Sequence, residues 1–475
     1  MSEARTLRWA GLLLPAAVAV GLAWSYGHSF LHPTFLGDQG IRLDRASELV
    51  VGVGQRQWLP FLQLHIHVLY RLGAPAQAFL LIPYAYTTLT LFLLAWLCRA
   101  VLRAPREALA ATALLLVGFA GSSFHWLGRS LYQEGIVIPL FLALVGLHTF
   151  APRRRAAFVV VLGLGMLTRE VFWIWWLAYT ALHWRGRLRD ARLRAAVLAL
   201  GAIPIAWLLA TGQGPLLARN APPEPLTLAG IAERAASLGR TLGAEWLLPV
   251  LVVLAGIFAL AAAQRGVRGL SFRGFHVFSA VSLAGIYGYV LVADPWHTTP
   301  GNTRALVPLF AHVLVWSILG WHEAARLRGP ARPAGRVLAA LSMLSMLKLS
   351  AIAGVLGGPD PRRTADDWEP LRLPRSARAE PGWEATLEAA LGPLRARRAA
   401  PLRVVLVDVS RREYLKLWVA AFLYDERRVV AADAPLPPAD VLVAPEGFEA
   451  PGLVRRARLR VSSDTTRDVL EPAAR

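Results

Sequence analysis

Two acidic residues stand beside apolar segments of the sequence, where a carboxylate could take part in chemistry. Asp38 lies in the loop after the first hydrophobic segment, and Glu134 lies just before a later one. A carboxylate at the mouth of a bundle of membrane helices is a functional-site hypothesis by default. Asp38 could act as a general base, or it could organise an acceptor hydroxyl or a metal ion. The alternative is a loop aspartate that caps the following helix.

Glu134 opens a predicted helix, where a carboxylate interacts favourably with the helix dipole alone. It could instead be a second carboxylate that faces Asp38 and positions the substrate or binds a metal. A divalent cation such as Mg²⁺ or Mn²⁺ held by Asp38 and Glu134 therefore stays open as a cofactor. His65 and His67 are two residues apart and fall on different faces of a helix, so they are poor co-ligands.

Basic side chains in the same loops are candidates for binding a phosphate. His125 and Arg129 precede Glu134, and the planar guanidinium of arginine donates two hydrogen bonds in register to phosphate oxygens. Arg169 lies in the short Leu167–Glu170 junction between two apolar runs. It either pairs with Glu170 and other neighbours or contributes to binding a substrate.

A later polar loop contains His297 and ends at Arg304, the start of another apolar run. A cation at a helix start opposes the helix dipole. Arg304 is therefore easier to explain if an anion binds nearby, which makes it the strongest candidate for a phosphate contact. The alternative is that its side chain reaches to the membrane interface.

The composition indicates a polytopic membrane protein that holds these side chains. The 475 residues are 55% hydrophobic and 17% charged, against about 25% charged in soluble domains. The net charge of +20 comes from arginines in short loops, which indicates membrane orientation rather than nucleic-acid binding. Cys98 is the one cysteine of the sequence, so an internal disulfide is excluded.

A membrane-spanning helix needs roughly 20 apolar residues, and the sequence predicts about eleven spans. Phe61–Leu72, with its histidines, and the stretch from Ile41 to Val50 are predicted as interfacial segments instead. In that second stretch, Asp44 and Glu48 are expected to form a solvated face. The predicted spans are Leu7–Trp24, Phe79–Val101, Leu109–Phe119, Ile136–Phe150, Ala156–Leu167, Val171–His183, Ala195–Ala210, Trp246–Ala263, Phe275–Val292, Leu306–Trp321 and Val337–Leu356.

Every second loop between these spans is rich in arginine, so those loops are predicted to be cytoplasmic. The first span is predicted to be retained as a membrane helix rather than cleaved. The loops that carry Asp38, Glu134, Arg169 and Arg304 then share the opposite side. The chain after the last span falls on that side too.

The C-terminal part changes in character. We divide the chain into a membrane domain (1–357), a Pro- and Arg-rich linker (358–400) and a soluble α/β module (401–475). Arg403–Asp408 is predicted as a buried strand and Arg412–Tyr424 as an amphipathic helix, with further strands at Arg428–Ala432 and Val441–Ala444. The module has no Gly-rich phosphate loop in its sequence. We expect it to have a packing or substrate-shaping role.

This layout resembles the GT-C superfamily, the polytopic membrane glycosyltransferases that use polyprenyl-phosphate sugars. The resemblance lies in the acidic residue of the long first outside loop (Asp38), the Leu59-Pro60 start of the next apolar run, and the acid at a later helix start (Glu134). The Leu167–Glu170 junction resembles the Leu-Thr-Lys/Arg turn of many members. A late outside loop ends in Arg304 before a span that contains Pro308, and an outside C-terminal module is common in the superfamily.

The resemblance implies a mannosyltransferase- or aminoarabinosyltransferase-like enzyme that transfers a sugar from a polyprenyl-phosphate donor on the periplasmic side. Asp38 would match the catalytic acid of the first loop, Glu134 the acid of the second, and Arg304 would contact the donor phosphate. The protein would be in a bacterial inner membrane with its C-terminal module in the periplasm. Its acceptor could be a glycan, a lipid or a protein. Many members carry paired acids in these loops, whereas Asp38 and Glu134 each stand alone.

Two other hypotheses remain from the sequence. An O-antigen-ligase-like or polymerase-like transferase would work through His125, Arg129, His297 and Arg304 and would tolerate Asp38→Asn. A membrane transporter or assembly scaffold would have no transferase activity, although transporters usually show polar or broken helices at mid-bilayer. No Gly-x-Ser-x-Gly or Walker sequence is present, so the hydrolase and ATP-driven classes have no support.

Overall fold

The computed structural model describes residues 3–26, 38–53, 56–122, 124, 127–128, 130–184, 186–211, 227–245, 247–293, 303–347, 383–397, 400–462 and 465–473. This part of the chain is mainly helical and has a small C-terminal sheet. Its contacts divide it into two compact units. The helical unit comprises Met1–Ala23, Gly52–Leu62 and Ile82–Gly354, and the sheet unit comprises Trp24–Val51, Gln63–Leu81 and Val355–Arg475.

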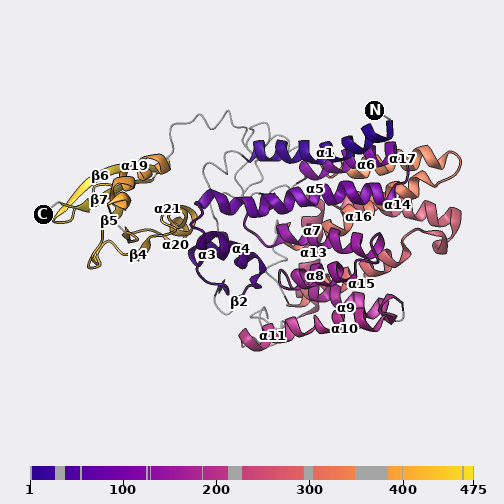
Figure 1. The fold of residues 1–475 in the computed structure, drawn as a ribbon, viewed down its shortest axis with the longest axis horizontal. Coiled ribbons are helices and arrows are strands. Elements are labelled where there is room, and N and C mark those ends of the chain that lie inside the picture. The colour runs from indigo at the N-terminus through magenta and orange to yellow at the C-terminus, as the bar shows by residue number, and fades with distance from the viewer. Residues whose placement is uncertain are drawn as a thin grey trace. The chain divides into compact units, whose positions relative to one another are not determined.

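The helical unit consists of apolar helices that lie side by side (Figure 1). A short hairpin, β1 (Gly52–Val53) and β2 (Arg56–Gln57), belongs to it. Short 3₁₀ helices η3 (Arg187–Arg189), η4 (Val267–Gly269) and η6 (Thr303–Leu306) lie in its loops. The helices are α1 (Glu3–Ser25), α5 (Leu81–Val101), α6 (Pro105–Ala120), α7 (Glu134–Thr149), α8 (Arg155–Met166), α9 (Val171–His183), α10 (Ala191–Ala199), α11 (Ala202–Thr211), α13 (Leu228–Ala244), α14 (Leu247–Arg265), α15 (Arg273–Ala293), α16 (Val307–Ala325) and α17 (Ala331–Leu344).

Five helical segments of the described chain are long and apolar enough to cross a membrane, which is consistent with a membrane protein. The predicted number of about eleven spans is not confirmed. Length is the physical reason, since α8 and α9 have 12 and 13 residues and reach about 20 Å against a hydrocarbon core of about 30 Å. The five segments are Ala76–Val101, Ala191–Thr211, Leu247–Arg265, Arg273–Val292 and Arg304–Ala325; shorter apolar helices cover Trp9–Trp24, Glu134–Thr149 and Arg155–Met166.

Helix α16 lies at the centre of the helical unit. In the segment Arg304–Ala325, which contains α16, 83% of the most apolar 18-residue stretch is buried. The corresponding share for Ala191–Thr211 is 17%. Helix α16 packs against α7, α14 and α17. Near its C-terminal end the buried carboxylate of Glu323 pairs with Arg265 and accepts a hydrogen bond from the Ser271 backbone N–H at 2.8 Å. The buried negative charge of Glu323 is therefore compensated by Arg265 of α14 and by a backbone N–H just before α15.

Close helix packing in the helical unit depends on glycine at a few positions. A Cβ atom at Gly118 of α6 would overlap the carbonyl oxygen of Met343 in α17, whereas one at Gly256 of α14 would meet nothing within 4 Å. Backbone atoms cannot move aside as a flexible side chain can, so α6 and α17 would have to separate.

We predict that Gly118→Ala lowers the thermal unfolding temperature of the detergent-solubilised protein, with a cost of about 1–3 kcal/mol from overpacking. Gly256→Ala is the matched control. It should leave that temperature unchanged or raise it slightly, because alanine favours a helix by about 1 kcal/mol over glycine. Equal unfolding temperatures for Gly118→Ala and Gly256→Ala would contradict the close approach of α6 and α17.

The sheet unit holds a five-stranded mixed sheet. The strand order is β4-β3-β5-β7-β6; β3 runs parallel to β4 and β5, while β5–β7 and β6–β7 are antiparallel. The strands are β3 (Arg403–Val407), β4 (Glu426–Val430), β5 (Val441–Pro445), β6 (Leu453–Ser462) and β7 (Thr465–Pro472). The helices of the unit are α3 (Asp38–Asp44), α4 (Pro60–Arg71), whose first residues belong to the helical unit, η1 (Ala76–Leu80), α19 (Trp383–Ala396), and the continuous helical stretch α20 (Arg411–Glu413), η8 (Tyr414–Trp418) and α21 (Val419–Ala421).

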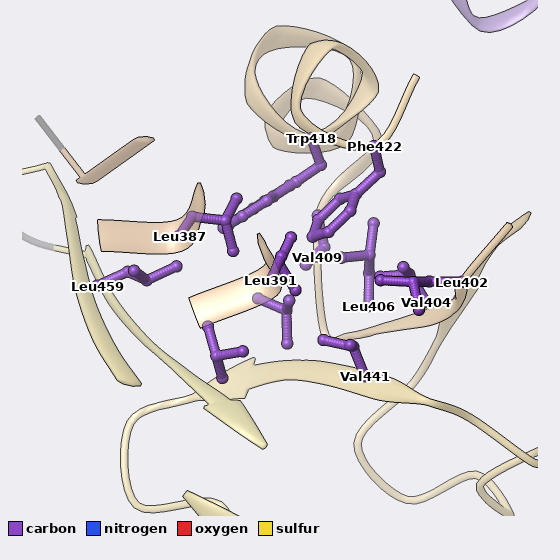
Figure 2. Close-up of a cluster of buried hydrophobic side chains, with 12 residues drawn as sticks. Leu387, Leu391, Leu402, Val404, Leu406, Val409, Trp418, Phe422, Val441 and Leu459 are labelled. Atoms are coloured by element: carbon purple, nitrogen blue, oxygen red, sulfur yellow. The ribbon is translucent and has the colours of Figure 1, made fainter. Parts of the chain in front are cut away.

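A hydrophobic core joins one face of the sheet to two helical segments (Figure 2). Trp418 and Phe422 come from the stretch that follows β3, and Leu387 and Leu391 come from α19. All four side chains are at most 3% exposed. Burying large side chains of this kind stabilises the fold by about 1.5–3 kcal/mol each.

The predicted strand–helix–strand arrangement is confirmed by the parallel pairing of β3 and β4 around the helical stretch. The structure adds the hairpin of β6 and β7, which the sequence reading did not include. It also places α19 inside residues 358–400, the predicted linker. The expected surface helix from Ile41 to Val50 is shorter, since α3 ends at Asp44.

Candidate functional site

Glu134 begins α7 and lies almost completely inside the helical unit. Its side chain is 2% exposed, and the apolar sequence of α7 that follows keeps this region away from water. An ionised carboxylate in such a place is costly unless cations compensate it. Two arginines supply that compensation.

Arg169 and Arg304 converge on the same oxygen of Glu134. Arg169 Nη2 lies 3.0 Å from Glu134 Oε1, and Arg304 Nε donates to that oxygen over 3.0 Å. Arg169 also lies 3.7 Å from Glu170 Oε2. The two guanidinium groups are largely buried, at 11% and 19% exposure. We call Glu134, Arg169 and Arg304 the carboxylate–arginine cluster.

The turn between α8 and α9 positions Arg169. Thr168 Oγ1 donates to the Leu164 carbonyl at 2.7 Å, and Trp173 Nε1 donates to the Met166 carbonyl at 2.9 Å. The Phe61 backbone N–H donates to the Leu167 carbonyl at 3.0 Å. These bonds satisfy carbonyl groups at the end of α8, which a helix leaves without internal partners. The turn is thus fixed on both sides of Arg169.

Arg304 is positioned by the 3₁₀ turn η6 before α16 and by an aromatic ring. Its guanidinium carbon lies 4.5 Å from the ring centroid of Tyr132, a cation–π geometry. The Tyr287 hydroxyl donates to the carbonyl of Ala305, the residue that follows Arg304, at 3.1 Å. The sequence analysis did not single out Tyr132, although its place two residues before Glu134 brings it to the same helix start.

The cluster combines two cationic groups with one buried carboxylate, and Glu170 lies beside Arg169. Each guanidinium has five N–H groups, and both meet the single oxygen Oε1 of Glu134. Glu134 Oε2 is buried and has no hydrogen-bond partner among the residues that the structure describes. Guanidinium groups of this kind are able to donate hydrogen bonds to the oxygens of a phosphate.

The arrangement argues against a divalent cation on Glu134. A metal ion at this carboxylate would approach two guanidinium groups that lie 3.0 Å from Oε1, and like charges repel strongly where water is excluded. The suggested Mg²⁺ or Mn²⁺ held jointly by Asp38 and Glu134 therefore fits this donor set poorly.

The structure thus brings together three of the predicted site residues, Glu134, Arg169 and Arg304. The others cannot be placed: His125, Arg129 and His297 lie outside the described residues, and so does the side chain of Asp38. The backbone of Asp38 is described as the first residue of α3.

Within the sheet unit, α3 is anchored by residues distant in the sequence. Tyr414 donates to Asp44 Oδ1 at 2.6 Å, and Arg427 Nη2 lies 3.2 Å from the same oxygen. Gln63 Nε2 donates to the carbonyls of Arg42 and Arg45 at 3.2 and 3.0 Å. Asp44, expected on a solvated face, is thus a structural contact instead.

Two further observations concern the polar groups of this anchor. Burial raises the pKa of Tyr414, and Asp44 adds to that effect, so the hydroxyl stays protonated and can donate at neutral pH. Arg42 lies in the stretch from Ile41 to Val50 that was predicted to be interfacial, and it is 2% exposed. The segment that begins at Asp38 is therefore held by the C-terminal strands and helices of its own unit.

In comparisons with known proteins, no family model matches the sequence, and no curated protein matches it.

We predict that Glu134→Gln destabilises the helical unit by about 3 kcal/mol, because two buried guanidinium groups lose their compensating charge. Glu107→Gln is the matched control: Glu107 is 33% exposed and pairs with the similarly exposed Arg336, and the loss of its charge should cost much less. Thermal unfolding in detergent measures both. Similar unfolding temperatures for the two variants would show that the cluster does not depend on the charge of Glu134.

We predict that Asp44→Ala destabilises the sheet unit by about 1–2 kcal/mol, since it removes a hydrogen bond and an ion pair from α3. Glu48→Ala, at an exposed position, should have no effect. Limited proteolysis between Asp38 and Val51 measures the change as faster cleavage in Asp44→Ala. Equal cleavage rates in the two variants would contradict the anchoring of α3.

Proposed function

We propose that this chain is a membrane glycosyltransferase of the GT-C type, which transfers a sugar from a polyprenyl-phosphate donor to an acceptor on the periplasmic side of a bacterial inner membrane. The observation that carries the proposal is the carboxylate–arginine cluster. Two guanidinium groups gather on one buried carboxylate at the starts of apolar helices. This is an arrangement suited to the phosphate of a lipid whose tail lies among those helices.

The placement of arginine along the helices supports the proposed sidedness. Glu134 begins α7, and the loop after α7 contains Arg153 and Arg154. Arg304 precedes α16, and Arg326 follows it. The cluster thus lies at the ends of these helices opposite to the arginine-rich loops, which the positive-inside rule assigns to the cytoplasm.

In the proposed reaction the acceptor hydroxyl attacks the anomeric carbon of the donor sugar. A new bond forms between that carbon and the acceptor oxygen, while the bond from the carbon to the phosphate oxygen breaks. Asp38 accepts the hydroxyl proton as general base. Polyprenyl phosphate leaves with the bonding electrons, and Arg304 and Arg169 stabilise the negative charge on its oxygens. Glu134 holds the two guanidinium groups in place.

The test is sugar transfer by the purified full-length protein in nanodiscs, with a panel of polyprenyl-phosphate sugars and a membrane extract as the source of acceptor. We expect Asp38→Asn to lose at least about 100-fold in rate, the usual scale of general-base catalysis, while donor binding is retained. Glu48→Gln is the matched control and should keep wild-type activity.

Two outcomes would contradict this account. Full activity in Asp38→Asn would remove Asp38 from the mechanism and favour the transferase that works through His125, Arg129, His297 and Arg304. Absence of both transfer and donor binding in the wild-type protein would favour a transporter or scaffold.

A further inference from the structure

The sheet unit contains a second polar site, separate from the carboxylate–arginine cluster. It is a cavity of about 760 Å³, within the range of ligand-binding pockets in general. Four segments of the unit line it: residues 75–77 around the start of η1, α19, residues 400–402 before β3, and residues 420–425 at and after the end of the helical stretch. Its wall combines aromatic rings with charged side chains.

The charged groups of the cavity are already matched to one another. The Arg395 guanidinium donates to Glu388 Oε2 and to Asp425 Oδ2, both at 2.8 Å, and to the Ala421 carbonyl at 3.1 Å. Asp425 Oδ1 accepts from the Leu402 N–H at 3.1 Å. Among the described lining residues, these two carboxylates and one guanidinium leave a net charge of −1. The cavity therefore disfavours phosphates and other acidic ligands.

Two aromatic side chains give the cavity rigid flat surfaces. Tyr424 stacks on Tyr70 with ring centroids 5.0 Å apart, and its hydroxyl donates to the Ala74 carbonyl at 2.7 Å. Trp383 packs against Trp418 with ring centroids 5.0 Å apart. Tyr424 nevertheless stays 38% exposed. Each ring is thus held by a second aromatic ring while part of it faces the ligand space.

We infer that this cavity binds a saccharide without acidic groups. The C–H bonds on one face of a sugar ring pack against an aromatic face, and its hydroxyls can both donate to carboxylates and accept from a guanidinium. Glu388, Arg395 and Asp425 supply those partners beside Tyr424 and Trp383. Their negative balance disfavours the phosphate that we propose for the carboxylate–arginine cluster, so the two sites would select different ligands.

The inference also names the acceptor class: the saccharide would be the glycan that receives the transferred sugar. This role as acceptor rests on the proposed function, whereas the binding of a saccharide to the cavity does not. A glycan held by the unit that contains Asp38 would lose less translational freedom when its hydroxyl meets the catalytic base.

The experiment measures binding of maltohexaose, cellohexaose and mannohexaose to the full-length protein in nanodiscs, by isothermal titration calorimetry without lipid-phosphate donor. Oligogalacturonate is the acidic comparison. We expect at least one neutral hexasaccharide to bind and oligogalacturonate to bind at least tenfold more weakly.

Glu388→Gln tests the site because its side chain is 68% exposed and the change should not impair folding. We expect it to weaken saccharide binding by about tenfold, the effect of losing a charge-assisted hydrogen bond. Glu446→Gln is the matched control, since Glu446 is a half-exposed carboxylate that pairs with Arg458 at 2.6 Å and lies outside the cavity lining. It should bind as the wild type does. Tyr424→Leu should weaken binding further by removing an aromatic face.

The inference is overturned if no neutral hexasaccharide binds, if oligogalacturonate binds most tightly, or if Glu388→Gln and Tyr424→Leu both bind like Glu446→Gln. Saccharide binding without any sugar transfer would count against the proposed function alone. Transfer without saccharide binding would count against this cavity alone.

Discussion

The buried carboxylate of Glu134, shared by Arg169 and Arg304, is the interaction on which the helical unit and its proposed chemistry depend. The three residues come from three separate segments: the start of α7, the turn between α8 and α9, and the turn before α16. Each charge is largely buried, so none is stable there without the others. The cluster therefore fixes where three helices begin relative to one another.

That constraint also supports the proposal that the cluster binds a lipid phosphate. A guanidinium alone at the start of a helix opposes the dipole and would turn toward water. Glu134 keeps two of them in place before any ligand arrives, so little side-chain freedom is lost on binding. The cation–π contact with Tyr132 also holds the guanidinium of Arg304 in place before a ligand binds. A preorganised pair of cations is what a leaving phosphate requires.

Part of this organisation could be predicted from the sequence and part could not. The dipole argument singled out Arg304 and Glu134 separately, because each is a charged residue next to an apolar run. Their mutual contact spans 170 residues, and local patterns carry no information on such pairs. For the same reason, the sequence could not predict the contact of Asp44 with Tyr414, which is 370 residues away. Hydropathy identified the apolar runs, and those at Ala156–Leu167 and Val171–His183 are already as short in the sequence as α8 and α9 are in the structure.

The C-terminal strands show a different limit. β3 and β5 are runs of buried valine, leucine and alanine and were predicted, since such runs are typical of parallel strands. β6 has four arginines in ten residues, and β7 buries Arg467 and Asp468. With these charged residues, the sequence does not show the alternation of apolar and polar residues that is typical of a strand. Arg467 is compensated by Glu413 at 2.6 Å and Asp468 by Arg458 at 3.0 Å, which only the folded chain brings together.

The most direct test of the central claim is the affinity of the wild-type protein for a polyprenyl phosphate without sugar, measured by native mass spectrometry beside Arg304→Gln and Arg332→Gln. Arg332 is an exposed arginine of α17 and serves as the matched control. The account predicts that Arg304→Gln weakens binding by about tenfold or more while Arg332→Gln binds as the wild type does. Equal affinity of the wild type and Arg304→Gln would contradict the claim that the carboxylate–arginine cluster binds the lipid phosphate.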